Sequence, residues 1–179
     1  MQEYRTDEAE FRLRVRSAFH EAGHAVAAEL LLRGVEFVTI QEEIKIVGDT
    51  KYIYSGFSQP RNHERPLLTS LQALHTELVV AFAGPVAEYA VMTVNEQVNE
   101  SKMYGQDDLQ IAVGLCNSLK LTDTERTEAL HKAMASSGDF VNNNSVAIEA
   151  VANALLRCVR LSGEEVSEIV RRCAKESIE

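Results

Sequence analysis

Apolar side chains recur at helical spacing near the start of the chain. Between residues 8 and 33 few helix-breaking residues occur, and the apolar positions are Phe11, Val15, Ala18, Phe19, Ala22, Val26 and Leu30. Steps of three and four residues place such positions on one face of an α-helix. Gly34 follows, and a glycine at this point is typical of a helix C-terminal cap. We therefore predict a long helix over residues 8–33 that ends at Gly34.

The following segment has the composition of β-strands. Residues 35–57, VEFVTIQEEIKIVGDTKYIYSGF, are rich in Val, Ile, Thr, Tyr and Phe. Gly48 and Asp49 interrupt them, and this pair suits the tight turn of a hairpin. The pattern predicts two antiparallel strands.

Helical patterns return after a polar loop bracketed by Pro60 and Pro66. We expect a helix or a pair of helices over residues 67–94. A bend near Gly84 and Pro85 is expected because proline cannot donate the hydrogen bond that continues a helix.

Two further helices are predicted to begin at capping boxes. In this motif a Ser or Thr side chain and a Glu three residues later each bond the other's backbone. Thr122 with Glu125 fits the pattern, and so does Ser162 with Glu165.

The remaining segments complete a mainly helical chain. A helix is expected over residues 107–119. Before the second capping box we expect a loop at residues 136–145, SSGDFVNNNS, and then a helix at residues 146–159. Together these patterns predict one mainly α-helical domain over residues 1–179, with a small antiparallel hairpin or sheet.

Composition and charge narrow the class of partners. The chain has 179 residues, 45% of them hydrophobic, with no Trp and only 6% aromatic residues, which favours closely packed helices over a β-sandwich. A net charge of -9 argues against nucleic acid and anionic membranes as main partners. The three cysteines form no CxxC pair, and the longest apolar run, Leu78–Ala87, is too short to cross a bilayer. We therefore expect a cytoplasmic protein with reduced thiols and without direct membrane insertion.

The first predicted helix contains FHEAGHAVAA, which matches the pattern HExxH. Residues four apart lie on one face of a helix, so His20 and His24 can point at the same metal ion. Glu21 is turned by about 100° from His20 and lies beside that ion, where a base can take a proton from a water molecule on the metal. Two histidines, a carboxylate and one open position fit catalytic Zn²⁺. Fe, Co or Mn can also occupy such a site.

Gly23, inside the motif, calls for a physical reason. Glycine in a helix interior costs up to about 1 kcal/mol relative to alanine. Close approach of another element, or room beside the metal, would supply one.

The third metal ligand is not fixed by the spacing alone. The candidates are Asp107, Asp108, Glu88, Glu77, His63, His75 and His131. Asp107 and Asp108 stand at a predicted helix start, where carboxylates also serve as ordinary N-terminal charges. Glu88 lies among apolar neighbours in GPVAEYAV, where an acid is rarely left unpaired. It could bind the metal, or it could accept the second ring N–H of a ligand histidine.

Several segments resemble the FtsH family, the membrane-anchored ATP-dependent zinc proteases of peptidase family M41. FHEAGHAVAA is similar to the zinc motif of the family, and VTIQEE to the start of its short sheet. ELVVAFAGPVAEYAV, YGQDDLQIAVGLC and AVANALLRCVRLSGEEVSEIV are similar to three later segments. These occur in the family's order over roughly residues 17–170. The resemblance implies a helical, zincin-like peptidase domain.

The resemblance also implies roles for individual residues. The implied zinc ligands are His20, His24 and Asp108. Glu21 would be the catalytic base, and Glu88 would orient a ligand histidine. Asp107 stands where the family has Asn and is the reserve ligand.

The family's ATPase module has no counterpart in this sequence, since there is no GxxxxGK[ST] phosphate loop. We therefore expect a zinc metallopeptidase that cleaves peptides or unfolded proteins without ATP. The prediction leaves room for a separate ATPase or protease partner and for a homo-oligomer. The alternative is a non-catalytic zinc-binding adaptor or assembly partner of a protease complex, although such a protein needs no Glu21. A zinc hydrolase of non-peptide amides is the third hypothesis.

Overall fold

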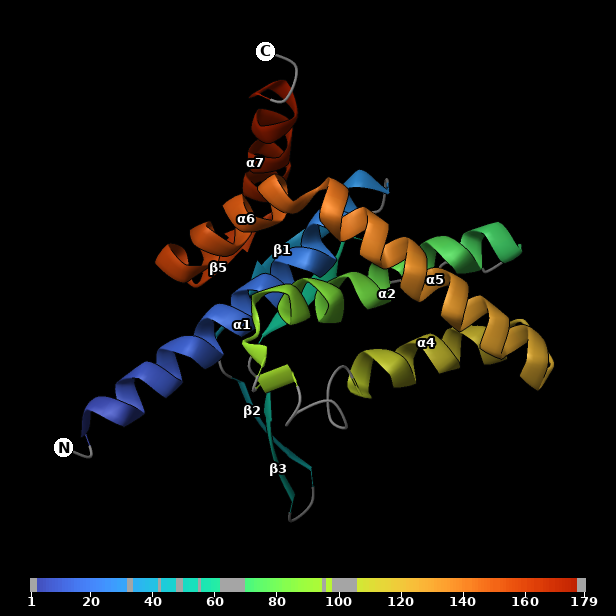
Figure 1. Cartoon of the computed structure of the whole chain (residues 1–179), viewed down its shortest axis with the longest axis horizontal. Coiled ribbons are helices and arrows are strands. Elements are labelled where there is room, and N and C mark those ends of the chain that lie inside the picture. The colour runs from blue at the N-terminus through green and yellow to red at the C-terminus, as the bar shows by residue number, and fades with distance from the viewer. Residues whose placement is uncertain are drawn as a thin grey trace.

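The computed structural model describes residues 3–31, 34–41, 43–47, 50–54, 56–61, 70–94, 96–97 and 106–176. The helices are α1 (Glu3–Leu30), α2 (Leu71–Val91), α4 (Gln106–Ser118), α5 (Asp123–Asn143), α6 (Ser145–Cys158) and α7 (Gly163–Glu176). The strands are β1 (Val35–Thr39), β2 (Glu43–Val47), β3 (Thr50–Tyr54), β4 (Phe57–Pro60) and β5 (Arg160–Ser162) (Figure 1). The prediction of a mainly helical chain with a small antiparallel sheet is confirmed.

Helices α1 and α2 pack against each other at the centre of the molecule (Figure 1). A Cβ added to Gly23 would collide with the backbone oxygen of Ala83 and lie 2.9 Å from the Cβ of Ala87. The glycine therefore allows α1 to approach the backbone of α2, which is the first of the two reasons expected from the sequence. The same close approach brings the side chains of the HExxH motif onto α2.

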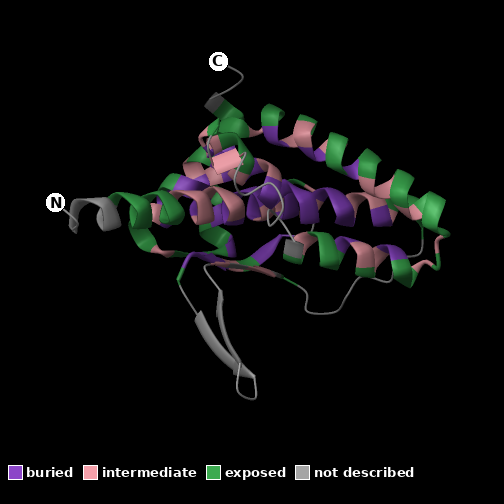
Figure 2. Ribbon diagram, turned by 60° about the horizontal axis from the view of Figure 1, so that its bottom comes forward, coloured by how far each residue is buried: buried purple, intermediate pink, exposed green. Residues whose placement is uncertain are grey.

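Buried residues are concentrated on the central helices (Figure 2). They form two clusters that share α2. The larger core joins α1, α6, α7 and β1 to the C-terminal half of α2, and it consists mostly of Ala and Val. The smaller core joins the N-terminal half of α2 to α4 and α5. Its buried members are Leu74, Leu78, Phe82, Ala112, Cys116 and Ala133. Helix α4 therefore reaches the rest of the fold through α2 and α5.

The strands form a three-stranded sheet and a separate hairpin. In the sheet, β1 lies between β4 and β5 and is antiparallel to both. The hairpin of β2 and β3 projects away from the helices (Figure 1). It confirms the predicted antiparallel pair, while the predicted turn residues Gly48 and Asp49 lie outside the described residues. Pairing of β1 with β4 and β5 was not predicted, because a strand's distant partners leave no local pattern.

Both predicted capping boxes are present. Thr122 Oγ1 accepts a hydrogen bond from the backbone N–H of Glu125 at 3.3 Å, and Glu125 Oε2 accepts one from the N–H of Thr122 at 2.8 Å. Ser162 and Glu165 make the same reciprocal pair, at 3.3 and 2.8 Å. These contacts begin α5 and α7 where the sequence predicts.

The prediction of a loop at residues 136–145 is wrong. Helix α5 continues to Asn143, and Asn144 alone separates it from α6. Buried Ser137 donates its hydroxyl to Ala133 O at 2.8 Å and to Val79 O of α2 at 3.2 Å. Packing against α2 thus outweighs the low helix propensity of Ser, Gly and Asn in this segment.

The ends of the first two helices also differ from the prediction. Helix α1 covers Glu3–Leu30 instead of residues 8–33. Gly34 has a φ of +63°, and its N–H returns to Ala28 O, so it closes the turn after the helix. Helix α2 is continuous through Pro85. Most of the predicted polar loop between Pro60 and Pro66 lies outside the described residues.

Within the part of the chain that the structure describes, no helix has the length and apolar content needed to cross a membrane.

Candidate metal centre

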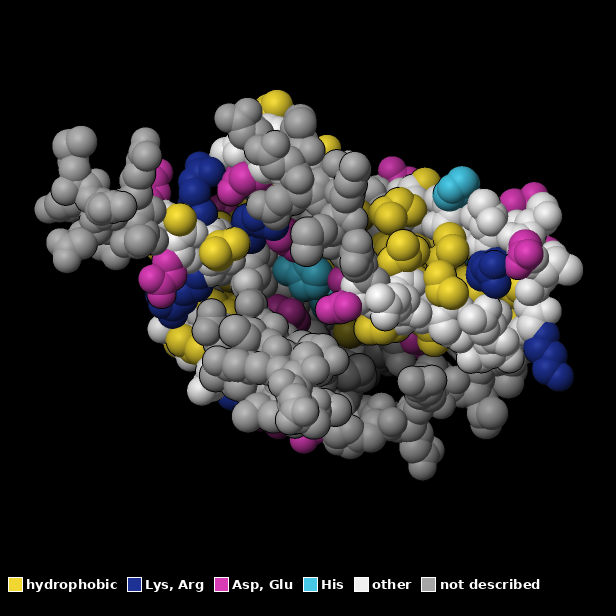
Figure 3. All heavy atoms as spheres, turned by 90° about the horizontal axis from the view of Figure 1, so that it is seen from below, with side chains coloured by type: hydrophobic (Ala, Val, Ile, Leu, Met, Phe, Trp, Pro, Cys, Tyr) yellow, Lys and Arg dark blue, Asp and Glu magenta, His cyan; other side chains and the backbone are white. Residues whose placement is uncertain are grey.

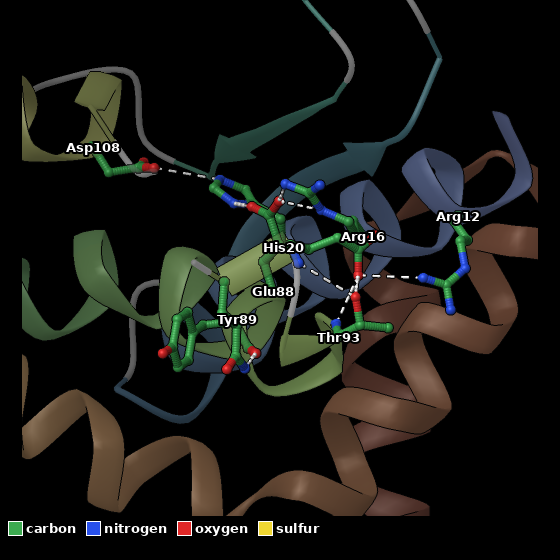
Figure 4. A network of polar contacts seen from close by, with 9 residues as sticks. Arg12, Arg16, His20, Glu88, Tyr89, Thr93 and Asp108 are labelled. Carbon is green, nitrogen blue, oxygen red and sulfur yellow. Dashed lines mark hydrogen bonds and ion pairs between the residues drawn. The ribbon is translucent and has the colours of Figure 1, made fainter. Parts of the chain in front are cut away.

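Three predicted ligands come together at one point. His20 and His24 project from α1, and Asp108 projects from the first turn of α4. Figure 4 shows Asp108 reaching His20 on one side while Glu88 of α2 reaches it on the other. Histidine and acidic side chains meet in a hollow on the face shown in Figure 3. Among the described residues, His20, His24 and Asp108 form the cluster with ligand atoms close enough to hold a metal ion.

The possible ligand atoms lie close to one another. His20 Nε2 and His24 Nε2 are 3.1 Å apart; Asp108 Oδ2 lies 3.4 Å from His20 Nε2, and Asp108 Oδ1 lies 3.2 Å from His24 Nε2. Two ligands bound to zinc at about 2.0 Å with tetrahedral angles are about 3.3 Å apart. The three side chains are therefore close enough that one atom from each could reach a common metal ion.

The hydrogen-bond partner of Nδ1 in each ring determines which ring nitrogen carries the hydrogen. His24 Nδ1 lies 2.9 Å from Val80 O of α2. A carbonyl oxygen can only accept, so Nδ1 carries the hydrogen and the Nε2 of a neutral ring has a free lone pair. His20 Nδ1 lies 2.9 Å from Glu88 Oε2, which fixes the same tautomer. The Nε2 of each neutral ring is thus the nitrogen whose lone pair faces the cluster.

The electrostatics of the cluster favour a positive charge at its centre. Burial alone would lower the pKa of His20, but contacts with Asp108 and Glu88 outweigh it and raise the pKa to about 10. Burial alone would raise the pKa of Asp108, but His20 and His24 hold it well below its usual range. The metal-free site therefore keeps a proton on His20 at neutral pH, where a metal ion would replace it.

Glu21 lies beside the cluster without joining it. The residue is buried, and a Cβ on Gly56 would lie 2.6 Å from its Oε1. The backbone just before β4 therefore packs directly on this carboxylate. Burial raises the pKa of Glu21, while His24 and His20 partly offset that rise. A carboxylate that is buried, and more basic than an exposed one, suits the exchange of protons near neutral pH.

Gly84 leaves room for the His24 ring. A Cβ on Gly84 would collide with His24 Nε2 and lie 2.6 Å from its Cε1. Because Gly84 precedes Pro85, it also avoids the clash that proline makes with the Cβ of the residue before it. The His24 ring therefore packs directly against the backbone of α2 at Gly84.

The other candidates from the sequence stay apart from this cluster. Asp107 is exposed next to Asp108, and His131 is exposed on α5. Glu77 and His75 lie on α2, nearer its N-terminus, and belong to no metal-binding group of the described residues. His63 lies outside the described residues. Of the two acids at the start of α4, the structure thus brings Asp108 to the histidines.

Glu88 takes the second of the two roles left open by its sequence context. Its Oε2 accepts from His20, and its Oε1 accepts from Arg16 Nε at 3.0 Å and Nη2 at 2.7 Å. Burial alone would raise the pKa of Glu88, but His20 and Arg16 lower it and keep the carboxylate ionised. Sequence reasoning missed Arg16. Its position four residues before His20, on the same face of α1, was the available signal.

No protein-family model matches the chain, and no curated protein matches it either.

Proposed function

We propose that the protein is a zinc metallopeptidase of the HExxH type, similar to the FtsH protease domain. In this proposal His20, His24 and Asp108 hold the metal, and Glu21 is the catalytic base. The main support is the convergence of the three side chains: the two Nε2 atoms are 3.1 Å apart, and each lies 3.4 Å or less from an oxygen of Asp108, which is close enough for a shared zinc ion.

The donor set favours zinc over harder cations. Two imidazoles and one carboxylate, with a fourth position open, are typical of catalytic zinc, whereas Mg²⁺ and Ca²⁺ prefer oxygen ligands. Bound zinc supplies a Lewis acid that polarises a carbonyl and lowers the pKa of water to about 7. The side chains of the protein then provide proton transfer and orientation.

Glu21 performs the proton transfer in this proposal. It takes the proton of the attacking water and delivers it to the nitrogen of the leaving amine, so the carboxylate is regenerated. Its raised pKa brings its basicity closer to that of the water it must deprotonate. The contact with Gly56 restricts the carboxylate to one side of the site.

The substrate we propose is an extended polypeptide. Strand β4 lies at one end of the sheet order β4-β1-β5 and begins one residue after Gly56. A peptide that adds to such an outer strand is held by backbone hydrogen bonds and passes beside Glu21. Only unfolded or flexible segments can adopt this form, so hydrolysis should need no ATP when the substrate is already unfolded.

The test is cleavage of casein by the zinc-loaded protein, with Glu21→Gln beside it and the exposed Glu149→Gln as a matched control. We expect the parent and Glu149→Gln to cut casein equally with or without ATP. Glu21→Gln should bind zinc normally and lose cleavage. Equal cutting by all three proteins would identify a contaminant. Zinc binding without any cleavage would favour the adaptor function instead.

A further inference from the structure

Arg16 stands one helical turn before His20 and is joined to it through Glu88 (Figure 4). Both contacting nitrogens of Arg16 bind the same oxygen of Glu88, Nε at 3.0 Å and Nη2 at 2.7 Å from Oε1. The other oxygen, Oε2, is thereby left to His20 Nδ1 at 2.9 Å. The three residues form a chain that ends at a proposed metal ligand.

We propose that Arg16 is a positioning residue of the metal centre. It holds Glu88 in the orientation in which Oε2 receives the Nδ1 proton of His20, and it thereby sets the affinity of the site for zinc. The inference rests on the proposed function, in that His20 binds the metal through Nε2.

The position of Glu88 requires such a holder. Its side chain has three rotatable bonds and is only 15% exposed, so water offers few alternative partners. Without Arg16, Oε2 could leave His20, and the imidazole would lose the contact that fixes its tautomer and ring orientation. Two bonds from one planar guanidinium hold Oε1 more firmly than a single ammonium contact would, and this leaves Oε2 directed at His20.

The placement of a cation beside a proposed cation site also needs a reason. A positive side chain one turn from a zinc ligand opposes metal binding by its charge. Here the Glu88 carboxylate bridges Arg16 and His20, so it shields one positive centre from the other. A cation at this position makes sense if its effect on the orientation of Glu88 favours metal binding more than its charge opposes it.

A second ion pair on the same helix provides the control. Arg12, one turn before Arg16, binds Glu96 at 3.4 Å, and its side chain is 47% exposed. Exposed ion pairs of this kind contribute little to the free energy of unfolding. Arg12→Met therefore removes an ion pair between α1 and the segment after α2, while Arg16, Glu88 and His20 are all retained.

The experiment measures zinc affinity by competition with a chromogenic chelator. Arg16→Met should weaken zinc binding by about 10- to 100-fold, the range for loss of a group that orients a metal ligand. Arg16→Lys should recover part of that loss, and Arg12→Met should bind as the parent does. In the Co²⁺-substituted protein, the visible d–d spectrum should change for Arg16→Met and not for Arg12→Met.

A double variant tests whether Arg16 acts through Glu88. Glu88→Gln should weaken zinc binding, and adding Arg16→Met to it should weaken binding little further. Thermal unfolding of the metal-free variants checks that each one folds. If Arg16→Met does not fold, the zinc affinity and cobalt spectrum of Arg16→Lys are compared with those of the parent instead.

Two results would overturn the inference. Arg16 variants with parental zinc affinity and an unchanged cobalt spectrum would show that the residue only stabilises the fold. Tighter zinc binding after Arg16→Met would show that its charge, and not its orientation of Glu88, dominates. Neither result depends on peptide cleavage, so a protein that binds zinc as expected but cuts nothing would refute the proposed function and leave this inference standing.

Discussion

Replacing Gly84 with alanine tests the metal centre through a single methyl group. The new Cβ would collide with His24 Nε2, the proposed metal-binding nitrogen, and lie 2.6 Å from Cε1. Ordinary contact begins at 3.4 Å, so the ring must retreat by about 0.8 Å or more. Metal–ligand distances tolerate shifts of only about 0.2 Å. We therefore expect His24 to be lost as a ligand.

The expected effects on binding and on stability differ in size. Loss of a direct ligand should exceed the 10- to 100-fold effect of losing an orienting group, so zinc affinity should fall by more than about 100-fold. The free energy of unfolding of the metal-free protein should also fall. Loss of the hydrogen bond from His24 to Val80 O costs about 0.5–1.5 kcal/mol, and the clash of the new Cβ with Pro85 removes the gain that alanine would otherwise bring to a helix.

The assay compares zinc affinity and metal-free thermal unfolding for Gly84→Ala and Gly138→Ala. Gly138 lies inside α5 with open space where a Cβ would stand. Its substitution should keep parental zinc affinity and raise stability by up to about 1 kcal/mol. Parental zinc affinity in Gly84→Ala would refute the assignment of His24 Nε2 as a ligand.

Four further results are expected. Gly56→Ala should displace the Glu21 carboxylate, which lies 2.6 Å from the new Cβ, so casein cleavage should fall while zinc stays bound; unchanged cleavage would argue against Glu21 as the base. Gly23→Ala should destabilise the protein by about 1–3 kcal/mol in denaturant unfolding, because the Cβ would collide with Ala83 O, and this overpacking outweighs the gain in helix propensity. Zinc affinity should rise about tenfold per pH unit toward pH 10, because zinc must displace the proton that His20 holds with a pKa of about 10; a flat profile from pH 6.5 to 8.5 would contradict this. In the metal-free protein the same raised pKa contributes stability that is complete below pH 6.5 and is lost as pH rises through about 10.

Features set by neighbours in the sequence were predictable. Helical spacing of His20 and His24 placed both rings on one face of α1, and the box of Thr122 with Glu125 located the start of α5. Each of these depends on residues within one or two helical turns. The sequence also indicated that Gly23 needs a close neighbour, although it could not show that the neighbour is α2.

Features set by tertiary packing were not predictable in the same way. Residues 136–145 have turn-forming composition, yet contacts such as that of Ser137 with α2 keep them helical. Strand β5 has three residues, too few for a periodic pattern. The choice of Asp108 over Asp107 depends on how α4 is turned as it packs on α2 and α5, and composition does not determine that. The bridge from Arg16 to Glu88 joins residues 72 positions apart and needs the pairing of α1 with α2.

The division of the interior into two cores has a consequence for folding energetics. The histidines belong to the helix at the centre of the larger core, whereas Asp108 belongs to α4, which packs in the smaller one. A bound ion would therefore act as a crosslink between two packing units, and its binding free energy would add to the stability of their docking. Chelation should then accelerate amide hydrogen exchange first in α4, while the amides of α1 stay protected by the core around them.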